Sequence, residues 1–191
     1  YLSRSEASEQ RWQVPVQIGI ETGENRESRR LLLKEGETRV PLPRGTRRLL
    51  INEGGHGFYR VHYDALLLKR LLEGGLHRLA PIERFNLVSD AWATTLAGQM
   101  PFPDYLALTR HFTHESDKNV WAVLLDSLSF LTRIVTADDR PALEAFVRSL
   151  IAPTVHELGW TPRPEDNELV RQLRGELIGA LGKLGNDLAI Q

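Results

Sequence analysis

Cysteine is absent from the sequence, and methionine occurs only at Met100. Without cysteine the chain can form no disulfide framework, thiolate metal site or cysteine nucleophile, and this absence fits a reducing compartment. Apolar runs are also short, and none approaches the roughly 20 residues that a membrane-spanning helix requires. The first residues carry charge at Arg4 and Glu6, where a signal peptide would have its apolar core. We therefore expect a cytoplasmic protein that does not insert into a membrane.

The sequence also lacks a dominant charge. Its 24 lysine and arginine residues face 25 aspartate and glutamate residues, for a formal net charge of −1. Proteins that bind nucleic acid rely on clustered basic residues, so this balance predicts no nucleic-acid partner. One short basic cluster, Arg44, Arg47 and Arg48, indicates a solvated strand edge that its charge protects against unwanted pairing.

The N-terminal part of the chain has the two-residue period of β-strands, with one solvated face. Polar or small residues alternate there with an apolar series, Trp12, Val14, Val16, Ile18 and Ile20. Pro15 removes a backbone donor, so we expect it at a sheet edge or a bulge. Further short strands are predicted between turns rich in glycine and proline, over residues 30–34, 38–42, 49–52 and 58–63. This spacing predicts an antiparallel β-sandwich.

The rest of the sequence has the period of α-helices. Asp64 is placed to cap a helix over residues 65–73, and Pro81 suits the first turn of a helix over 81–96. The apolar stripe predicted for the second of these is Ile82, Phe85, Val88, Trp92 and Leu96.

Later stripes predict helices that begin near Pro103, Asp117, Thr136 and Leu169, with Pro153 kinking or ending the third of them. Each helix has one apolar face, so the helices must stack into an antiparallel bundle or an armadillo-like superhelix. The expected fold is therefore α+β in sequence order. It comprises a β-sandwich domain over residues 1–63 and a helical domain over residues 64–191.

Residues 52–64 read Asn-Glu-Gly-Gly-His-Gly-Phe-Tyr-Arg-Val-His-Tyr-Asp. This stretch resembles the junction between the β-sandwich and the helical C-terminal domain in zinc aminopeptidases of the aminopeptidase N type, a gluzincin family. Other motifs resemble the same family in the same order: Trp12-x-x-Pro15-Val16, Pro81-x-Glu83-Arg84 with Asp90-Ala91, Glu115-x-Asp117 with Trp121, and Leu158-Gly159-Trp160.

The resemblance implies a parent enzyme that removes N-terminal residues from peptides, using water activated by zinc and a glutamate base. The family's zinc ligands, in His-Glu-x-x-His and a second glutamate, and its Gly-x-Met-Glu-Asn substrate anchor are absent from these residues. The chain would then be a C-terminal portion that contains no catalytic residue, metal ligand or cofactor of its own. Its sandwich would begin upstream of Tyr1, and its helical domain would continue past Gln191 and help to shape the substrate chamber.

Four residues are candidates for the domain junction or the chamber. Arg60 lies in an aromatic segment, where a guanidinium usually bonds a carboxylate or a carbonyl, and Tyr63 belongs to the same motif. Arg84 and Asp90 are six positions apart on one predicted helix, so they cannot pair along one face. We expect each of them to bond a neighbouring helix or loop.

His111 and His114 are three residues apart, which makes a metal pair conceivable. A third ligand is not evident in the sequence, so a solvated helix end is the favoured interpretation. Trp92, Trp121 and Trp160 are expected in the core rather than in a ligand cage.

A different class of function is also compatible with these observations. A free-standing interaction module could bind a peptide at a sheet edge or in a helical groove, without any enzymatic activity. In either case an incomplete sandwich would expose an apolar face, so we expect the isolated chain to associate with itself.

Overall fold

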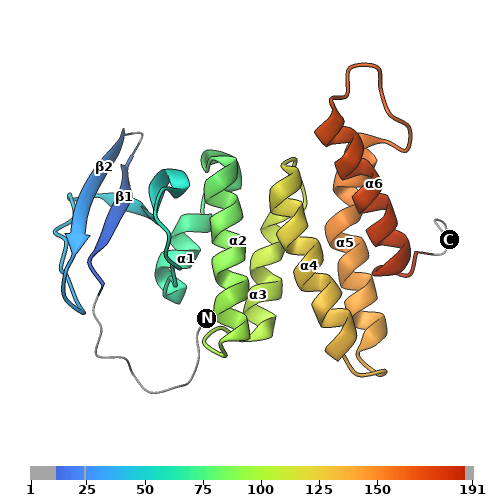
Figure 1. The fold of residues 1–191 in the computed structure, drawn as a ribbon, viewed down its shortest axis with the longest axis horizontal. Helices are drawn as coiled ribbons and strands as arrows, with labels where there is room; N and C mark the ends of the chain where they lie inside the picture. The colour runs from blue at the N-terminus through green and yellow to red at the C-terminus, as the bar shows by residue number, and fades with distance from the viewer. Residues whose placement is uncertain (1–11, 24, 188–191) are drawn as a thin grey trace. The chain divides into compact units, whose positions relative to one another are not determined.

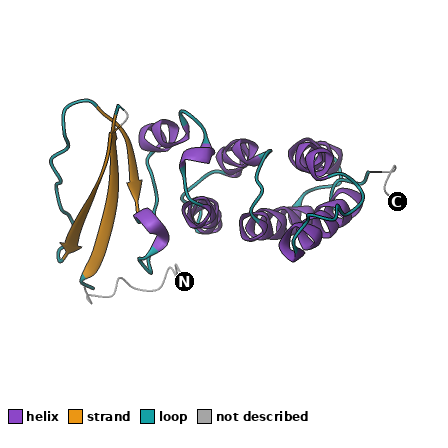
Figure 2. Ribbon diagram, turned by 90° about the horizontal axis from the view of Figure 1, so that it is seen from above, coloured by secondary structure: helices purple, strands orange, loops and turns teal. Residues whose placement is uncertain are grey.

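The computed structural model describes residues 12–23 and 25–187. A three-stranded antiparallel sheet comes first along the chain, and six α-helices follow it (Figures 1 and 2). This order confirms the predicted α+β fold class. Residues 1–99 and 100–191 form two compact units, and the predicted domain boundary between residues 63 and 64 stays a prediction.

The middle strand of the sheet is β1 (Val14–Thr22), which lies between β2 (Asn25–Leu33) and β3 (Thr46–Ile51). β1 pairs with β2 along its whole length, whereas its pairing with β3 starts only at Ile18, opposite Ile51. Pro15 pairs with β2 alone, so it lies where β1 is itself a sheet edge. This pairing confirms the expected edge position of Pro15, at which a missing backbone donor is tolerated.

Two of the predicted strands, 38–42 and 58–63, are wrong, because both segments run as irregular chain. Pro41 deprives the first segment of a backbone donor, and Pro43 follows directly after it. In the second segment the Val61 N–H donates to the Asp90 carboxylate at 3.0 Å instead of to a strand. The residues that the structure describes accordingly contain one sheet, not the two facing sheets of a sandwich.

The first unit contains α1 (Ala65–Leu72) and α2 (Pro81–Leu96). The short 3-10 helix η1 (Glu53–Gly55) precedes α1, and a second one, η2 (Leu76–Arg78), lies between α1 and α2. Asp64 caps α1 as predicted, since its carboxylate accepts a hydrogen bond from the Leu67 N–H at 2.8 Å. α2 has the predicted bounds.

The predicted apolar stripe of α2 is wrong at both ends, because Ile82 and Leu96 are exposed. The buried side of α2 includes the charged residues Glu83 and Asp90 beside Val88. These carboxylates accept hydrogen bonds from other segments, and such bonds allow them to occupy positions that a hydropathy pattern assigns to solvent.

The second unit contains α3 (Phe102–Thr109), η3 (Arg110–Phe112), α4 (Lys118–Ile134), α5 (Arg140–Leu158) and α6 (Glu168–Lys183). Figure 1 shows α4, α5 and α6 side by side, and each packs against the other two. α4 begins where the sequence predicts, and Asp117 caps it. One apolar face of α4 is buried, at Val120, Leu124, Leu128 and Leu131.

α5 begins at Arg140 rather than near Thr136, and it continues through Pro153 to Leu158. The prediction that Pro153 could end this helix is therefore wrong. Its neighbours Ile151 and Val155 are buried, and Thr154 donates to the Thr113 carbonyl at 2.8 Å. Tertiary contacts on both sides of the proline offset its missing backbone hydrogen bond. None of the helices among the described residues is long and apolar enough to cross a membrane.

Candidate functional site

A tight turn follows β3 and leads towards the helices. Asn52 adopts a left-handed conformation, with φ of 61°, and its side chain makes two hydrogen bonds to the backbone of Gly57, at 2.6 and 3.0 Å. Gly55 has φ of 69°, and a Cβ atom added to it would lie 2.5 Å from Cγ1 of Ile82. The turn thus requires glycine at position 55, both for its backbone conformation and for its close approach to α2.

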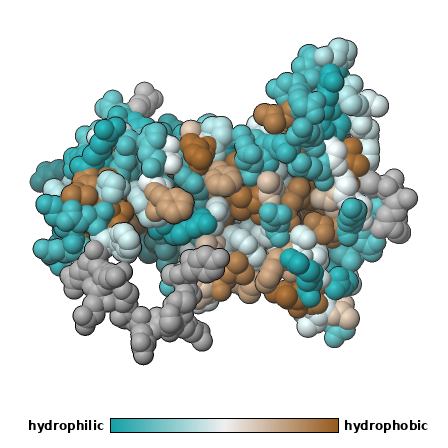
Figure 3. All heavy atoms as spheres, viewed as in Figure 1, coloured by the Kyte–Doolittle hydropathy of each residue, from teal (hydrophilic) through white to brown (hydrophobic). Residues whose placement is uncertain are grey.

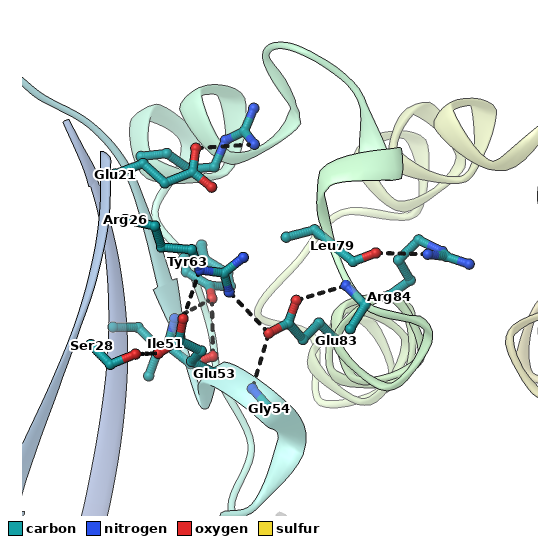
Figure 4. Close-up of polar contacts among 12 residues, drawn as sticks. Glu21, Arg26, Ser28, Ile51, Glu53, Gly54, Tyr63, Leu79, Glu83 and Arg84 are labelled. Carbon is teal, nitrogen blue, oxygen red and sulfur yellow. Dashed lines mark hydrogen bonds and ion pairs between the residues drawn. The ribbon is translucent and has the colours of Figure 1, made fainter. Parts of the chain in front are cut away.

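Charged side chains from three segments meet beside this turn (Figure 4). Arg26 of β2 donates to Glu53 of η1 at 2.7 Å and to Glu83 of α2 at 3.1 Å. Ser28 donates to the other carboxylate oxygen of Glu53. A Cβ atom on Gly19 would lie 2.8 Å from Glu53, so this carboxylate sits directly against the middle strand of the sheet.

Glu83 also accepts hydrogen bonds from two backbone N–H groups, those of Gly54 at 3.0 Å and Ala80 at 2.8 Å. Its side chain is only 4% exposed. A buried carboxylate is stable when it is paired and hydrogen-bonded in this way. Arg26, Ser28, Glu53 and Glu83 therefore form a polar junction that fastens the sheet to the turn and to α2, and we refer to these four residues as the junction network.

The junction network shifts the pKa values of Glu53 and Arg26. Burial alone would raise the pKa of Glu53, but hydrogen bonds from Ser28 and Arg26 outweigh burial and lower this pKa below its ordinary value. Burial also opposes the charge of Arg26, whereas its bond to Glu53 and the negative charge of Glu83 raise its pKa. Glu53 and Arg26 are consequently both charged at neutral pH.

A second polar contact joins the irregular segment 58–63 to α2. The Arg60 Nη1 atom donates to the Ser89 hydroxyl at 2.7 Å and to the Asp90 carboxylate at 2.9 Å. The other oxygen of Asp90 accepts from the Val61 N–H. Burial raises the pKa of Asp90, although the bonds from Arg60 and Val61 partly oppose this shift. The expectation that Arg60 bonds a carboxylate or a carbonyl is confirmed, and the partner is the Asp90 carboxylate.

Tyr63 and Arg84 bond other segments. The buried Tyr63 hydroxyl accepts from the Ile51 N–H at 2.9 Å, and burial raises the pKa of this hydroxyl. Arg84 donates to the Leu79 carbonyl at 2.7 Å, in the loop before α2. Arg84 and Asp90 thus bond different loops, as expected. Of the four candidates, Arg60 and Asp90 are joined by a hydrogen bond, and Tyr63 and Asp90 line one small cavity. Their assignment to a substrate chamber stays a prediction.

The junction network as a whole was not predicted from the sequence. One signal was available for Glu83, which is the third residue of a helix that starts at Pro81, and a glutamate at this position commonly bonds the residue before the helix. Ser28 and Arg26 carry no local signal, because their partners Glu53 and Glu83 are distant in sequence.

The predicted solvated edge at Arg44, Arg47 and Arg48 is wrong for Arg48, which is 5% exposed. Arg48 stands opposite Glu21 in the pairing of β3 with β1, and the two side chains form an ion pair at 3.5 Å. Cross-strand pairing of opposite charges accounts for this position.

His111 and His114 do not share an α-helix, since His111 lies in η3 and His114 in the turn after it. His114 instead contacts Glu157, with 2.6 Å between Nδ1 and Oε1. Among the described residues no three histidine, aspartate or glutamate side chains are grouped as metal ligands. This part of the chain does not fit a zinc ion.

The three tryptophans expected in the core have different environments. Trp121 is fully buried, and its indole N–H donates to the Glu115 carbonyl at 2.7 Å. Trp92 is half-buried. Trp160 is 61% exposed, so that prediction is wrong. It follows Gly159, which ends α5, and therefore lies in a loop instead of on a helix face.

The sequence model of the ERAP1-like C-terminal domain matches residues 49–191. This match starts in β3 and includes all six helices. The chain belongs to the ERAP1-like C-terminal domain family. Within this domain, both the turn after β3 and the Arg60–Asp90 contact lie in the matched region, whereas Arg26 and Ser28 precede it.

Curated relatives of this ERAP1-like chain are aminopeptidases. Aminopeptidase M1-A of Oryza sativa subsp. japonica is 29% identical over 144 residues, covering 73% of this chain and 16% of that protein. Aminopeptidase 2 of Candida albicans is 27% identical over 177 residues, with coverages of 91% and 19%. Aminopeptidase M1 of Arabidopsis thaliana is 27% identical over 205 residues, with coverages of 98% and 23%. The chain spans about a fifth of the length of these relatives, and the resemblance to this aminopeptidase family is confirmed.

Proposed function

We propose that this chain is the non-catalytic C-terminal portion of a zinc-dependent aminopeptidase that removes N-terminal residues from peptides. The observation that carries the proposal is the match to the ERAP1-like C-terminal domain over residues 49–191. Relatives named aminopeptidases, of which the chain covers about a fifth, support it further. The zinc ion and the residues that bind it would belong to the rest of such a protein. A cytoplasmic location belongs to the same proposal, supported by the lack of cysteine.

In this proposal the chain holds domains together and limits the chamber that the substrate enters. The junction network supports the first role, because it joins strand, turn and helix through largely buried charges. Arg60 supports the second role. Its guanidinium is 59% exposed although Asp90 and Ser89 fix its orientation, so it could meet a peptide without a large loss of side-chain entropy.

The test compares the 191-residue chain with the full natural chain from the same source. Zinc content and hydrolysis of aminoacyl amides are measured for both. We expect about one zinc ion and activity in the long chain, and neither in the short one. Zinc-dependent activity in the short chain, or none in the long chain, would contradict the proposal.

A free-standing interaction module remains the second candidate function. The observation that favours it is an open apolar cavity of about 420 Å³ on one face of the sheet. If the natural gene encodes a protein that starts near Tyr1, this candidate replaces the first. The test is therefore the length of the natural transcript and of the protein it produces.

A further inference from the structure

Polar side chains gather in the interior of the first unit as well as on its surface. Over the strand-containing part of the chain, hydrophilic side chains cover much of the surface that Figure 3 shows, with some hydrophobic ones among them. In the interior, a small cavity of about 10 Å³ is lined by the end of β3, the segment 61–63 and α2. The polar members of its lining are Asn52, Tyr63, Glu83, Asn86 and Asp90.

The cavity is largely closed to solvent, and it is small. Most of its lining residues are buried, namely Leu50, Asn52, Tyr63, Glu83, Leu87 and Asp90. The others, Ile51, Val61 and Asn86, are half-buried. A cavity needs about 10–15 Å³ to hold a water molecule, so the size of this one fits a single water molecule and nothing larger.

Two polar groups of the lining have hydrogen-bonding capacity to spare. The Tyr63 hydroxyl accepts from the Ile51 N–H at 2.9 Å, but the Ile51 carbonyl that faces its own proton is 3.4 Å away. That distance exceeds the usual O–H···O range of about 2.5–3.0 Å. The Asn86 amide makes no hydrogen bond to any residue in the described part of the chain.

The two carboxylates of the lining can also accept more hydrogen bonds. One oxygen of Asp90 accepts from Arg60 and the other from Val61, while Oε2 of Glu83 accepts from Ala80. Because a carboxylate oxygen can accept two hydrogen bonds, each of these oxygens has a site left. The lining therefore combines a hydroxyl donor with several acceptors, and a buried water molecule needs two to four such partners.

The charges around the cavity favour a neutral ligand. Carboxylate and amide oxygens also suit a hard metal cation, but both carboxylates already have cationic partners. Arg26 pairs with Glu83 at 3.1 Å, and Arg60 pairs with Asp90 at 2.9 Å. A metal ion would add an uncompensated positive charge in buried surroundings, which is costly. Size and charge together select water.

We propose that this cavity is a binding site for one water molecule, which accepts a hydrogen bond from the Tyr63 hydroxyl and donates to the carboxylates of Asp90 and Glu83. The water links the junction network, through Glu83, to the contact between Arg60 and Asp90. The two polar contacts then form one network that joins β3, the segment 58–63 and α2. The proposal does not depend on the parent being an aminopeptidase.

The first experiment is a crystal structure of the 191-residue chain at a resolution that shows ordered water. We expect one peak of electron density in the cavity, within hydrogen-bonding distance of the Tyr63 hydroxyl and the Asp90 carboxylate. A density map without this peak overturns the proposal.

The second experiment counts long-lived internal water molecules in solution by oxygen-17 magnetic relaxation dispersion. Asn86→Leu should lower the count by one, because leucine is larger than asparagine and removes a polar group from the lining. Asn119→Leu is the matched control, since Asn119 is exposed on α4, and it should leave the count unchanged. Circular dichroism checks that both variants are folded. An unchanged count in folded Asn86→Leu contradicts the proposal, and the wild-type crystal structure decides alone if this variant does not fold.

The third experiment distinguishes water from a metal ion. The transition temperature of thermal unfolding is measured in sodium chloride, calcium chloride and choline chloride at equal ionic strength. We expect the same transition temperature in all three salts. A higher value in one metal salt that Asn86→Leu abolishes would show that the cavity binds a cation, and it would overturn the proposal.

Discussion

Glu83 is the residue on which the junction between sheet and helix depends most. Its carboxylate accepts from the side chain of Arg26 and from the N–H groups of Gly54 and Ala80, and it is almost fully buried. A change at this position leaves several donors without a partner at once. We therefore expect position 83 to tolerate substitution less than the partly exposed Arg26.

Glu83→Ala should lower the free energy of unfolding by about 3 kcal/mol, as for other buried ion pairs that lose one member. Urea denaturation followed by circular dichroism measures this difference. Glu35→Ala serves as the control, because Glu35 is exposed, and its effect should stay within about 0.5 kcal/mol. Equal effects of the two variants would contradict the role of the junction network.

The lowered pKa of Glu53 predicts how stability depends on pH. A carboxylate with a lowered pKa stabilises the folded state above its ordinary pKa, and this contribution is lost as the pH falls through the lowered value. The contribution of Asp90 to stability depends on pH in the opposite direction. Its pKa is raised, so its contribution is present below the ordinary pKa and is lost as the pH rises through the raised value.

For Glu53→Gln we expect a stability deficit that is largest at neutral pH and shrinks as the pH is lowered from about 5 to about 2. Urea midpoints of the wild type and the variant across this range provide the measurement. A deficit that stays constant with pH would mean that the charge of Glu53 does not stabilise the fold.

At the scale of elements, the turn after β3 depends on glycine at one position, Gly55. Gly55→Ala would place a methyl group against Ile82 and force a positive φ on alanine, so we expect a loss of about 1–3 kcal/mol. Gly36→Ala is a matched control in open space. It should be neutral or stabilise by a few tenths of a kcal/mol, because alanine restricts the unfolded chain. Thermal unfolding of both variants compares them directly.

The helices could be predicted from sequence better than the strands, and the reason is the range of the interactions involved. Asp64, Pro81 and Asp117 act on backbone groups within a few residues, so they mark helix starts that the structure confirms. A strand needs a distant partner. Residues 58–63 have an alternating pattern, but the Val61 N–H bonds the carboxylate of Asp90, which no local pattern reveals.

The range of the interactions also decides which parts of the candidate site could be predicted. The expectation of a carboxylate or a carbonyl as the partner of Arg60 rested on the chemistry of a guanidinium in an aromatic segment, and the partner in the structure is Asp90. The junction network was not predicted, because it forms only when β2, the turn and α2 meet. Arg26 and Glu83 are 57 residues apart, and their pairing depends on tertiary structure.

At the scale of the whole molecule, the second compact unit has a core of its own. α4, α5 and α6 pack against one another and bury Leu124, Leu128, Val147, Ile151 and Leu177. We expect residues 100–191 to fold when produced alone, with a helical circular dichroism spectrum and a cooperative thermal transition. A spectrum typical of an unfolded chain would show that this core needs residues 1–99.

The contrasting positions of the tryptophans give the chain an intrinsic optical reporter. Trp121 of α4 is fully buried in the helical core, whereas Trp12 and Trp160 are exposed to solvent. A soluble quencher such as iodide will suppress the emission of the two solvated indoles most and that of the half-buried Trp92 less, and it will spare the blue-shifted emission of Trp121. Fluorescence recorded in the presence of iodide therefore follows the opening of the helical core without any added label.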